Sequence, residues 1–139
     1  IMDINLERLY KYMWLFSLLI TLIFILLGPK LITFFFGREY LLSLELIPIL
    51  GFSIFFNGIA IADNAYLNFY NIRFIILIKT IVSLTINIVL NIFLIPILGI
   101  KGAAISLLLA TIFNGYGGVL IDKNQKKHYK NLFFPLKRI

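Results

Sequence analysis

The chain contains four long apolar runs, separated by short stretches that hold charged residues, glycine or proline. These runs cover residues 9–28, 44–69, 74–97 and 102–121. Because an α-helix rises about 1.5 Å per residue, roughly 20 apolar residues cross a hydrocarbon core about 30 Å thick. The pattern therefore predicts four transmembrane helices.

Proline and glycine set the expected ends of these helices. The first run stops at Gly28 and Pro29, because proline lacks an amide donor and clashes with the preceding turn. Residues 31–36 are apolar again but too few to cross a membrane, so they form either a kinked continuation of the first helix or a segment lying at the interface. Pro96 and Gly99 are expected to end the third helix.

Composition supports a membrane environment. Hydrophobic residues make up 61% of the 139 residues and charged residues 14%, against about 45–50% and about 25% in soluble domains. A soluble fold of this length leaves roughly a third of its unfolded surface in water, and the chain has too few polar residues to cover that area. A soluble domain and a disordered chain are both excluded. We expect an all-α, integral membrane helical bundle with four transmembrane helices.

The chain lacks the residue patterns that carry common enzyme chemistry. It contains no cysteine, which removes disulfides, thiolate nucleophiles and cysteine-rich metal sites. It also contains no H-E-x-x-H pair, no G-x-S-x-G elbow and no P-loop sequence. The sequence therefore predicts a protein that is not an enzyme and that uses neither a cofactor nor a metal.

The positive charges favour one orientation in the membrane. Thirteen Lys and Arg against six Asp and Glu give a net charge of +7. Four crossings place both termini and the loop near residue 71 on one side, together with ten of the cations. Lys30, Arg38 and Lys101 lie on the other side. Cytoplasmic segments carry the excess of Lys and Arg. We expect cytoplasmic termini, a membrane domain over residues 1–121, a basic cytoplasmic tail over residues 122–139, and no nucleic-acid partner.

Polar residues follow one side of the second and third predicted helices. At about 100° per residue, those of the second helix fall within an arc of roughly 60° and those of the third within roughly 80°. The second helix carries Ser53, Asn57, Asn64, Asn68 and Asn71, and the third carries Thr80, Ser83, Asn87 and Asn91. Because lipid cannot satisfy polar groups, we expect the two polar sides to be buried together, away from the acyl chains.

Two interpretations of these polar sides stay open. The amides hydrogen-bond across packed helices, each stabilising the pair by about 0.6–2 kcal/mol, or the two sides line a water-filled path for a polar substrate. The fourth helix differs, since it carries small residues that let another backbone approach closely. These are Gly102, Ala103, Ser106, Ala110, Gly117 and Gly118, and they predict a packing helix.

Three charged residues near the same end of the bundle are functional candidates. Asp63 lies about 100° from the asparagine stripe and either pairs with Arg73 or Lys79 or acts as a carboxylate that couples transport to a proton or cation. Arg73 and Lys79 either extend to the headgroup region and fix the topology or attract an anionic lipid headgroup.

Two segments resemble one family of membrane proteins. Residues 94–106, LIPILGIKGAAIS, are similar to the L-I-P-x-x-G-I-x-G-A-A-I-[AS] signature of bacterial polysaccharide flippases. Upstream, residues 35–40, FFGREY, followed by residues 46–50, LIPIL, are similar to the F-G-x-x-Y and x-P-x-L segment of the same proteins. These are the O-antigen and capsule repeat-unit translocases of the multidrug/oligosaccharidyl-lipid/polysaccharide exporter superfamily, and the resemblance covers about residues 9–122.

The resemblance implies a function, a location and partners. It implies movement of an undecaprenyl-pyrophosphate-linked sugar unit across the bacterial inner membrane, within a larger two-lobed fold of which this chain looks like the C-terminal third. The implied partners are the lipid-linked oligosaccharide, membrane lipids, and the rest of the transporter or other polysaccharide-assembly proteins. Cations would meet the pyrophosphate, with Lys79 first and Arg73 next, and the asparagine sides would bind sugar hydroxyls or water.

Two alternatives to a flippase remain. The chain is a four-helix membrane subunit that packs against a partner and moves nothing, or it is a small multidrug exporter that acts as an oligomer. The second alternative calls for an acidic residue within the first span, and residues 13–27 contain none.

Overall fold

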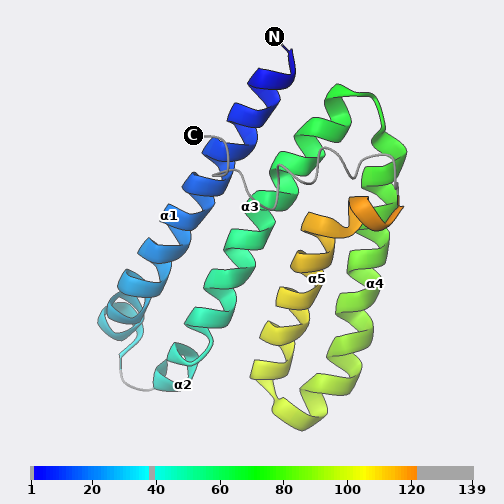
Figure 1. Ribbon diagram of the computed structural model, residues 1–139. Helices are drawn as coiled ribbons and strands as arrows, with labels where there is room; N and C mark the ends of the chain where they lie inside the picture. Colours follow the sequence, from blue (N-terminus) through cyan, green and yellow to red (C-terminus); the bar gives the residue numbers. More distant parts are fainter. Residues whose placement is uncertain (1, 38–39, 122–139) are drawn as a thin grey trace.

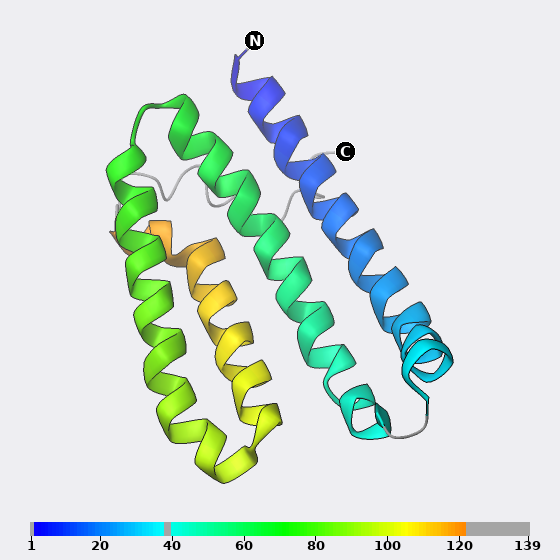
Figure 2. The same ribbon diagram turned by 180° about the vertical axis from the view of Figure 1, so that it is seen from behind.

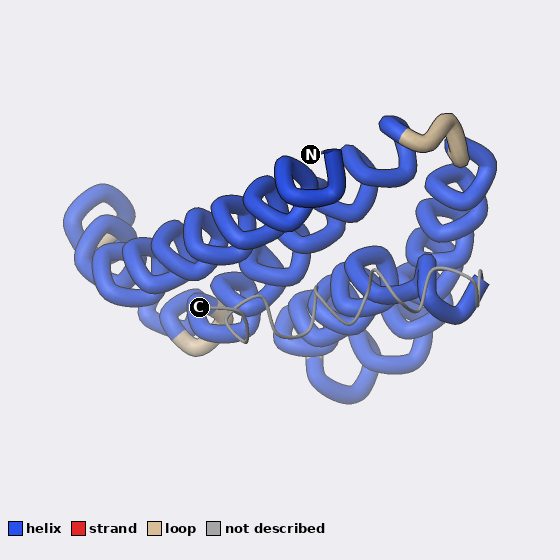
Figure 3. The backbone as a smooth tube through the Cα atoms, turned by 45° about the horizontal axis from the view of Figure 1, so that its top comes forward, coloured by secondary structure: helices blue, strands red, loops and turns tan. Residues whose placement is uncertain are grey.

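The computed structural model describes residues 2–37 and 40–121, and helices make up nearly all of this part of the chain (Figure 3). The helices are α1 Met2–Phe36, α2 Leu41–Leu44, α3 Ile47–Phe69, α4 Arg73–Leu98 and α5 Ile100–Ile121. Four of them are apolar and contain spans of 19 to 29 residues, or about 28–44 Å. The prediction of an all-α bundle with four transmembrane helices is confirmed, and the predicted tail at 122–139 lies outside the described residues.

The first helix continues through its proline. Helix α1 includes Pro29 and ends at Phe36, so residues 31–36 form the continuation and not a separate interfacial segment. The hydroxyl of Thr33 donates to the carbonyls of Pro29 and Lys30, at 2.9 and 3.0 Å. Hydroxyl side chains of this kind help membrane helices tolerate proline, because they satisfy nearby backbone groups that the lipid cannot.

The second membrane helix begins later than residue 44. Residues Leu41–Leu44 form the short helix α2, and α3 begins at Ile47 with Pro48 in its first turn. A proline in this position is well accommodated, because the first amides of a helix have no partner within it. The predicted helix over residues 44–69 therefore begins three residues later, and only Leu44 of that run lies in α2.

Two tight connections join the last three membrane helices. Asn71, with a φ of 59°, turns the chain from α3 into α4, and Gly99, with a φ of 60°, turns it from α4 into α5. Asparagine adopts a φ near +60° more readily than most other residues. Gly99, with a ψ of −138°, has a backbone conformation that essentially only glycine adopts. The short connections make α4 antiparallel to both α3 and α5.

The four long helices lie side by side in the order α1, α3, α5, α4 (Figures 1 and 2). Helix α5 packs against both α3 and α4, which themselves touch at few positions. The prediction that residues 102–121 form a packing helix is confirmed. The main apolar cluster lies toward the end of the bundle where α3 turns into α4, and its buried members are Tyr10, Ile59, Ala62, Tyr66, Leu67 and Ile75.

The start of α1, the α3–α4 turn and the end of α5 lie at one end of the bundle (Figure 1). The charge distribution predicts that this end is cytoplasmic. Because the chain has no cysteine, single cysteines report the orientation cleanly. We expect an impermeant maleimide added to intact cells to label Ser43→Cys, and to label Phe69→Cys only after lysis. The reverse pattern would overturn the predicted orientation.

Candidate functional site

The packing of α5 fixes how the polar sides of α3 and α4 are placed. The Ser83 hydroxyl donates to the Ala110 carbonyl at 2.7 Å, which joins α4 to α5. A β-carbon at Gly115 would lie 3.3 Å from the Phe56 carbonyl oxygen, so the backbones of α5 and α3 approach closely there. With α5 between them, the polar sides of α3 and α4 do not pack against each other. The expectation that they are buried together is wrong.

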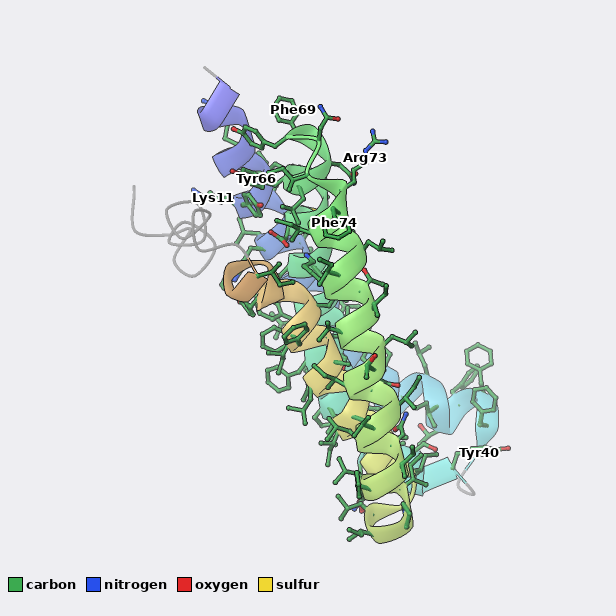
Figure 4. The ribbon with its side chains drawn as sticks, turned by 90° about the vertical axis from the view of Figure 1, so that its right-hand side faces the viewer. Lys11, Tyr40, Tyr66, Phe69, Arg73 and Phe74 are labelled. Atoms are coloured by element: carbon green, nitrogen blue, oxygen red, sulfur yellow. The ribbon has the colours of Figure 1, made fainter. Side chains whose placement is uncertain are left out.

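Those polar sides instead share one broad side of the layer. Around α3, Tyr66 lies about 160–180° from Asn57 and Asn64. Around α4, Arg73 has the same angular position as Asn91, since they are five full turns apart. Figure 4, in which α4 is nearest the viewer, shows Arg73 and Tyr66 projecting from opposite sides of the layer. The asparagines of α3 and α4 therefore lie on the same side as Arg73.

Helix α5 contributes an asparagine to this side. Tyr116 packs against the cluster that contains Tyr66, and Asn114 lies about 160° away from Tyr116 around α5. Asn114 therefore lies between the asparagines of the two flanking helices. The sequence pattern did not reveal Asn114, because it is the one asparagine in its helix and forms no stripe with others. We call this surface the amide face, made of Asn57, Asn64, Asn68, Asn87, Asn91 and Asn114.

The amide face covers most of the depth of the membrane. Asn57 and Asn114 are at similar depth, because Gly115 lies against Phe56. Asn68 lies three residues before Asn71, in the α3–α4 turn, and Asn91 lies twenty residues after it. Measured from this turn, the asparagines span roughly 25 Å along the layer, most of a hydrocarbon core of about 30 Å.

Most hydrogen-bonding capacity on the amide face is unused. Asn91 donates to Asn87 at 3.1 Å within α4, and in the described part of the chain this is the one hydrogen bond between asparagine side chains. The Oδ1 atoms of Asn64, Asn91 and Asn114 are buried without a hydrogen-bond partner. Buried acceptors are nearly always satisfied in native proteins, so these three atoms call for a hydrogen-bond donor that the described residues do not supply. Asn57 and Asn68 are exposed.

The other polar positions predicted from the sequence are placed differently. Ser53 is buried and donates to the Ile49 carbonyl of its own helix at 3.1 Å. Ser83 is buried against α5, as described above, so neither hydroxyl is available to a substrate. Thr80 is exposed and lies about 20° from Arg73 around α4, so it is on the side of the amide face. Asn71 is exposed in the α3–α4 turn.

A buried ion pair joins α3 to α4. The Lys79 ammonium donates to the Asp63 carboxylate, and both side chains are at most 1% exposed. Of the two cations that the sequence offers to Asp63, the structure places Lys79 beside it. Lys79 is therefore enclosed and neutralised, and it does not reach the amide face. This corrects its ranking as the first cation for an anionic headgroup.

Arg73 is the exposed cation on the side of the amide face. It is the first residue of α4, and Figure 4 shows it projecting into open space at the α3–α4 turn. Its guanidinium pairs with no acidic residue among the described positions. A guanidinium in this place offers bidentate hydrogen bonds to a phosphate. Within the same described residues, no cluster of three metal-ligating side chains is present.

No family model, no curated protein and no solved structure matches this chain. The resemblance to polysaccharide flippases therefore rests on the motifs at residues 35–50 and 94–106 alone. The role of the amide face is inferred from its own chemistry together with these two motifs.

Proposed function

We propose that this chain forms part of a transporter that moves an undecaprenyl-pyrophosphate-linked oligosaccharide across the bacterial inner membrane. The observation that carries the proposal is the amide face. It places six asparagines on one side of a membrane-spanning layer, three of them with buried acceptors that have no partner. An amide both donates and accepts hydrogen bonds, as a sugar hydroxyl does. Lipid satisfies neither kind of group.

The position of Arg73 supports the same proposal. With the termini in the cytoplasm, as the charge distribution predicts, Arg73 lies at the cytoplasmic end of the amide face. Lipid-linked sugars are loaded from that side, and a guanidinium there suits the pyrophosphate. The glycan then contacts the asparagines as it crosses. In this proposal the rest of the transporter covers the amide face from the opposite side.

The test compares two substitutions on α4, each introduced into the full-length protein in its own cells. Asn87→Leu removes an amide from the amide face. Thr85→Leu removes a hydroxyl that donates to the Ile81 carbonyl of its own helix and that lies about 160° from Asn87. We expect Asn87→Leu combined with Asn57→Leu to lower surface polysaccharide about tenfold or more, with lipid-linked oligosaccharide accumulating inside the cell. Thr85→Leu should leave export normal.

Deleting the gene is the second arm of this test. The proposal predicts loss of the surface polysaccharide and accumulation of its lipid-linked precursor. Normal export after deletion would overturn the transport function. Normal export by the double asparagine variant, with wild-type amounts of protein, would overturn the role of the amide face.

A further inference from the structure

The charged residues of the layer are kept away from the amide face. Within the described α3, α4 and α5, they are Asp63, Arg73, Lys79 and Lys101. Asp63 and Lys79 neutralise each other in the interior. Lys101 pairs with Glu45 at the other end of the bundle and lies about 140° from Asn114 around α5. Beyond Arg73 at one end, the amide face offers hydrogen bonds without charge.

A neutral lining selects among sugars by their charge. Hydroxyl and N-acetyl groups exchange hydrogen bonds with asparagine side chains in both directions. A carboxylate accepts hydrogen bonds only, and it loses the hydration of a full charge when it moves along a surface that supplies no cation. The free energy of that loss raises the barrier for a charged sugar and leaves the barrier for a neutral one unchanged.

We infer that the oligosaccharide moved along the amide face is uncharged, built from neutral hexoses and N-acetylhexosamines and free of uronic acids and phosphorylated sugars. The inference rests on the proposed function and specifies its substrate. The pyrophosphate of the carrier meets Arg73 at the α3–α4 turn, and the asparagines of the three helices meet the sugar. The enclosure of Lys79 by Asp63 is the contact that keeps the lining neutral.

The experiment measures translocation of two probes in vesicles that contain the full protein. One probe is an undecaprenyl-pyrophosphate-linked trisaccharide of N-acetylglucosamine and glucose, and the other has glucuronate in place of one glucose. Translocation is read from the glycan that becomes accessible to an impermeant glycosidase. We expect the neutral probe to cross about ten times faster or more, since a tenfold ratio needs only about 1.4 kcal/mol.

Each outcome separates the inference from the proposed function. Equal rates, or faster movement of the glucuronate probe, would overturn the inference and leave the transport function standing. Absence of movement of both probes would overturn the transport function itself.

Two substitutions at one position test the cause of the selection. Asn57→Lys adds a cation to the centre of the amide face, and we expect it to raise the glucuronate-to-neutral rate ratio about fivefold or more. Asn57→Asp should lower the same ratio. Thr85→Lys, on α4 but turned away from the amide face, is the matched control and should leave the ratio unchanged. Because each ratio is measured on one preparation, differences in the amount of folded protein cancel. An unchanged ratio in both Asn57 variants would overturn the inference.

Discussion

Replacing Lys79 with methionine while Asp63 is kept is expected to destabilise the folded chain by about 3–5 kcal/mol. The cause is the carboxylate, which is at most 1% exposed and would lose the cation that offsets its charge. Replacing Asp63 with asparagine alone should have a similar effect, because it leaves the ammonium without its counter-charge. Unfolding can be followed in detergent by the fluorescence of Trp14, the one tryptophan in the chain.

The double substitution tests whether the single variants are destabilised by a buried charge that has lost its partner. With Lys79→Met and Asp63→Asn together, no charge stays buried, and we expect most of the lost stability to return. Lys101→Met is the matched control, because Lys101 also pairs with an acid but is about half exposed, as is Glu45. Its loss should cost under about 1 kcal/mol. Single variants at Asp63 and Lys79 as stable as this control would show that the pair does not hold α3 and α4 together.

Gly58→Ala is expected to destabilise the contact between α1 and α3 by about 1–3 kcal/mol. A β-carbon at Gly58 would overlap the Ser17 hydroxyl and lie 2.6 Å from the Ser17 β-carbon. Ser17 is buried and donates to the Met13 carbonyl at 2.6 Å, so it cannot turn away without losing this hydrogen bond. The two helices would have to separate. The same fluorescence measurement gives the change in unfolding free energy.

Gly28→Ala in the same interface is the control. A β-carbon at Gly28 would lie 3.5 Å from the side chain of Ile47, an ordinary van der Waals contact. This variant should retain wild-type stability or exceed it, since alanine favours the helix over glycine. Combining Gly58→Ala with Ser17→Gly should recover stability. Equal effects of the two glycine substitutions would contradict the close approach of α1 and α3 at Gly58.

The four helices were predictable because membrane thickness and chain length leave little freedom. A run of about 20 apolar residues has few alternatives to a spanning helix. The helix ends were less certain, and the reasons are local. Pro29 lies inside α1, whereas Pro48 lies in the first turn of α3. In α1 the hydroxyl of Thr33 supports the backbone next to the proline, a contact that residue counting does not weigh.

The order of the helices in the layer could not be read from the sequence. Small residues showed that residues 102–121 pack closely, but not that they pack on two sides. Gly115 faces α3, and Ala110 accepts the hydrogen bond from α4. The sequence shows that the asparagines follow one side of each helix. Whether those two sides face each other depends on the order of the helices in the layer. The contribution of Asn114 became visible only with the helices in place.

The pairing of Asp63 with Lys79 had a sequence signal that charge counting overlooks. Both residues lie eight positions from Asn71, whose left-handed conformation turns α3 into α4. Equal distances from a tight turn bring two antiparallel helices level, so the two side chains meet at the same depth. The symmetry of the hairpin predicts this contact, and it favours pairing over a role of Lys79 in binding an anionic headgroup.

The position of α5 between α3 and α4 has a consequence for biogenesis. Helices emerge from the ribosome in chain order, so α3 and α4 emerge before α5, which lies between them in the finished layer. Until α5 arrives, the Ser83 hydroxyl lacks the acceptor on Ala110. The ion pair of Asp63 and Lys79 and the apolar contacts of Ile75 are then what joins α3 to α4. Assembly is then completed when α5 inserts between α3 and α4, and not when it adds to the edge of the layer.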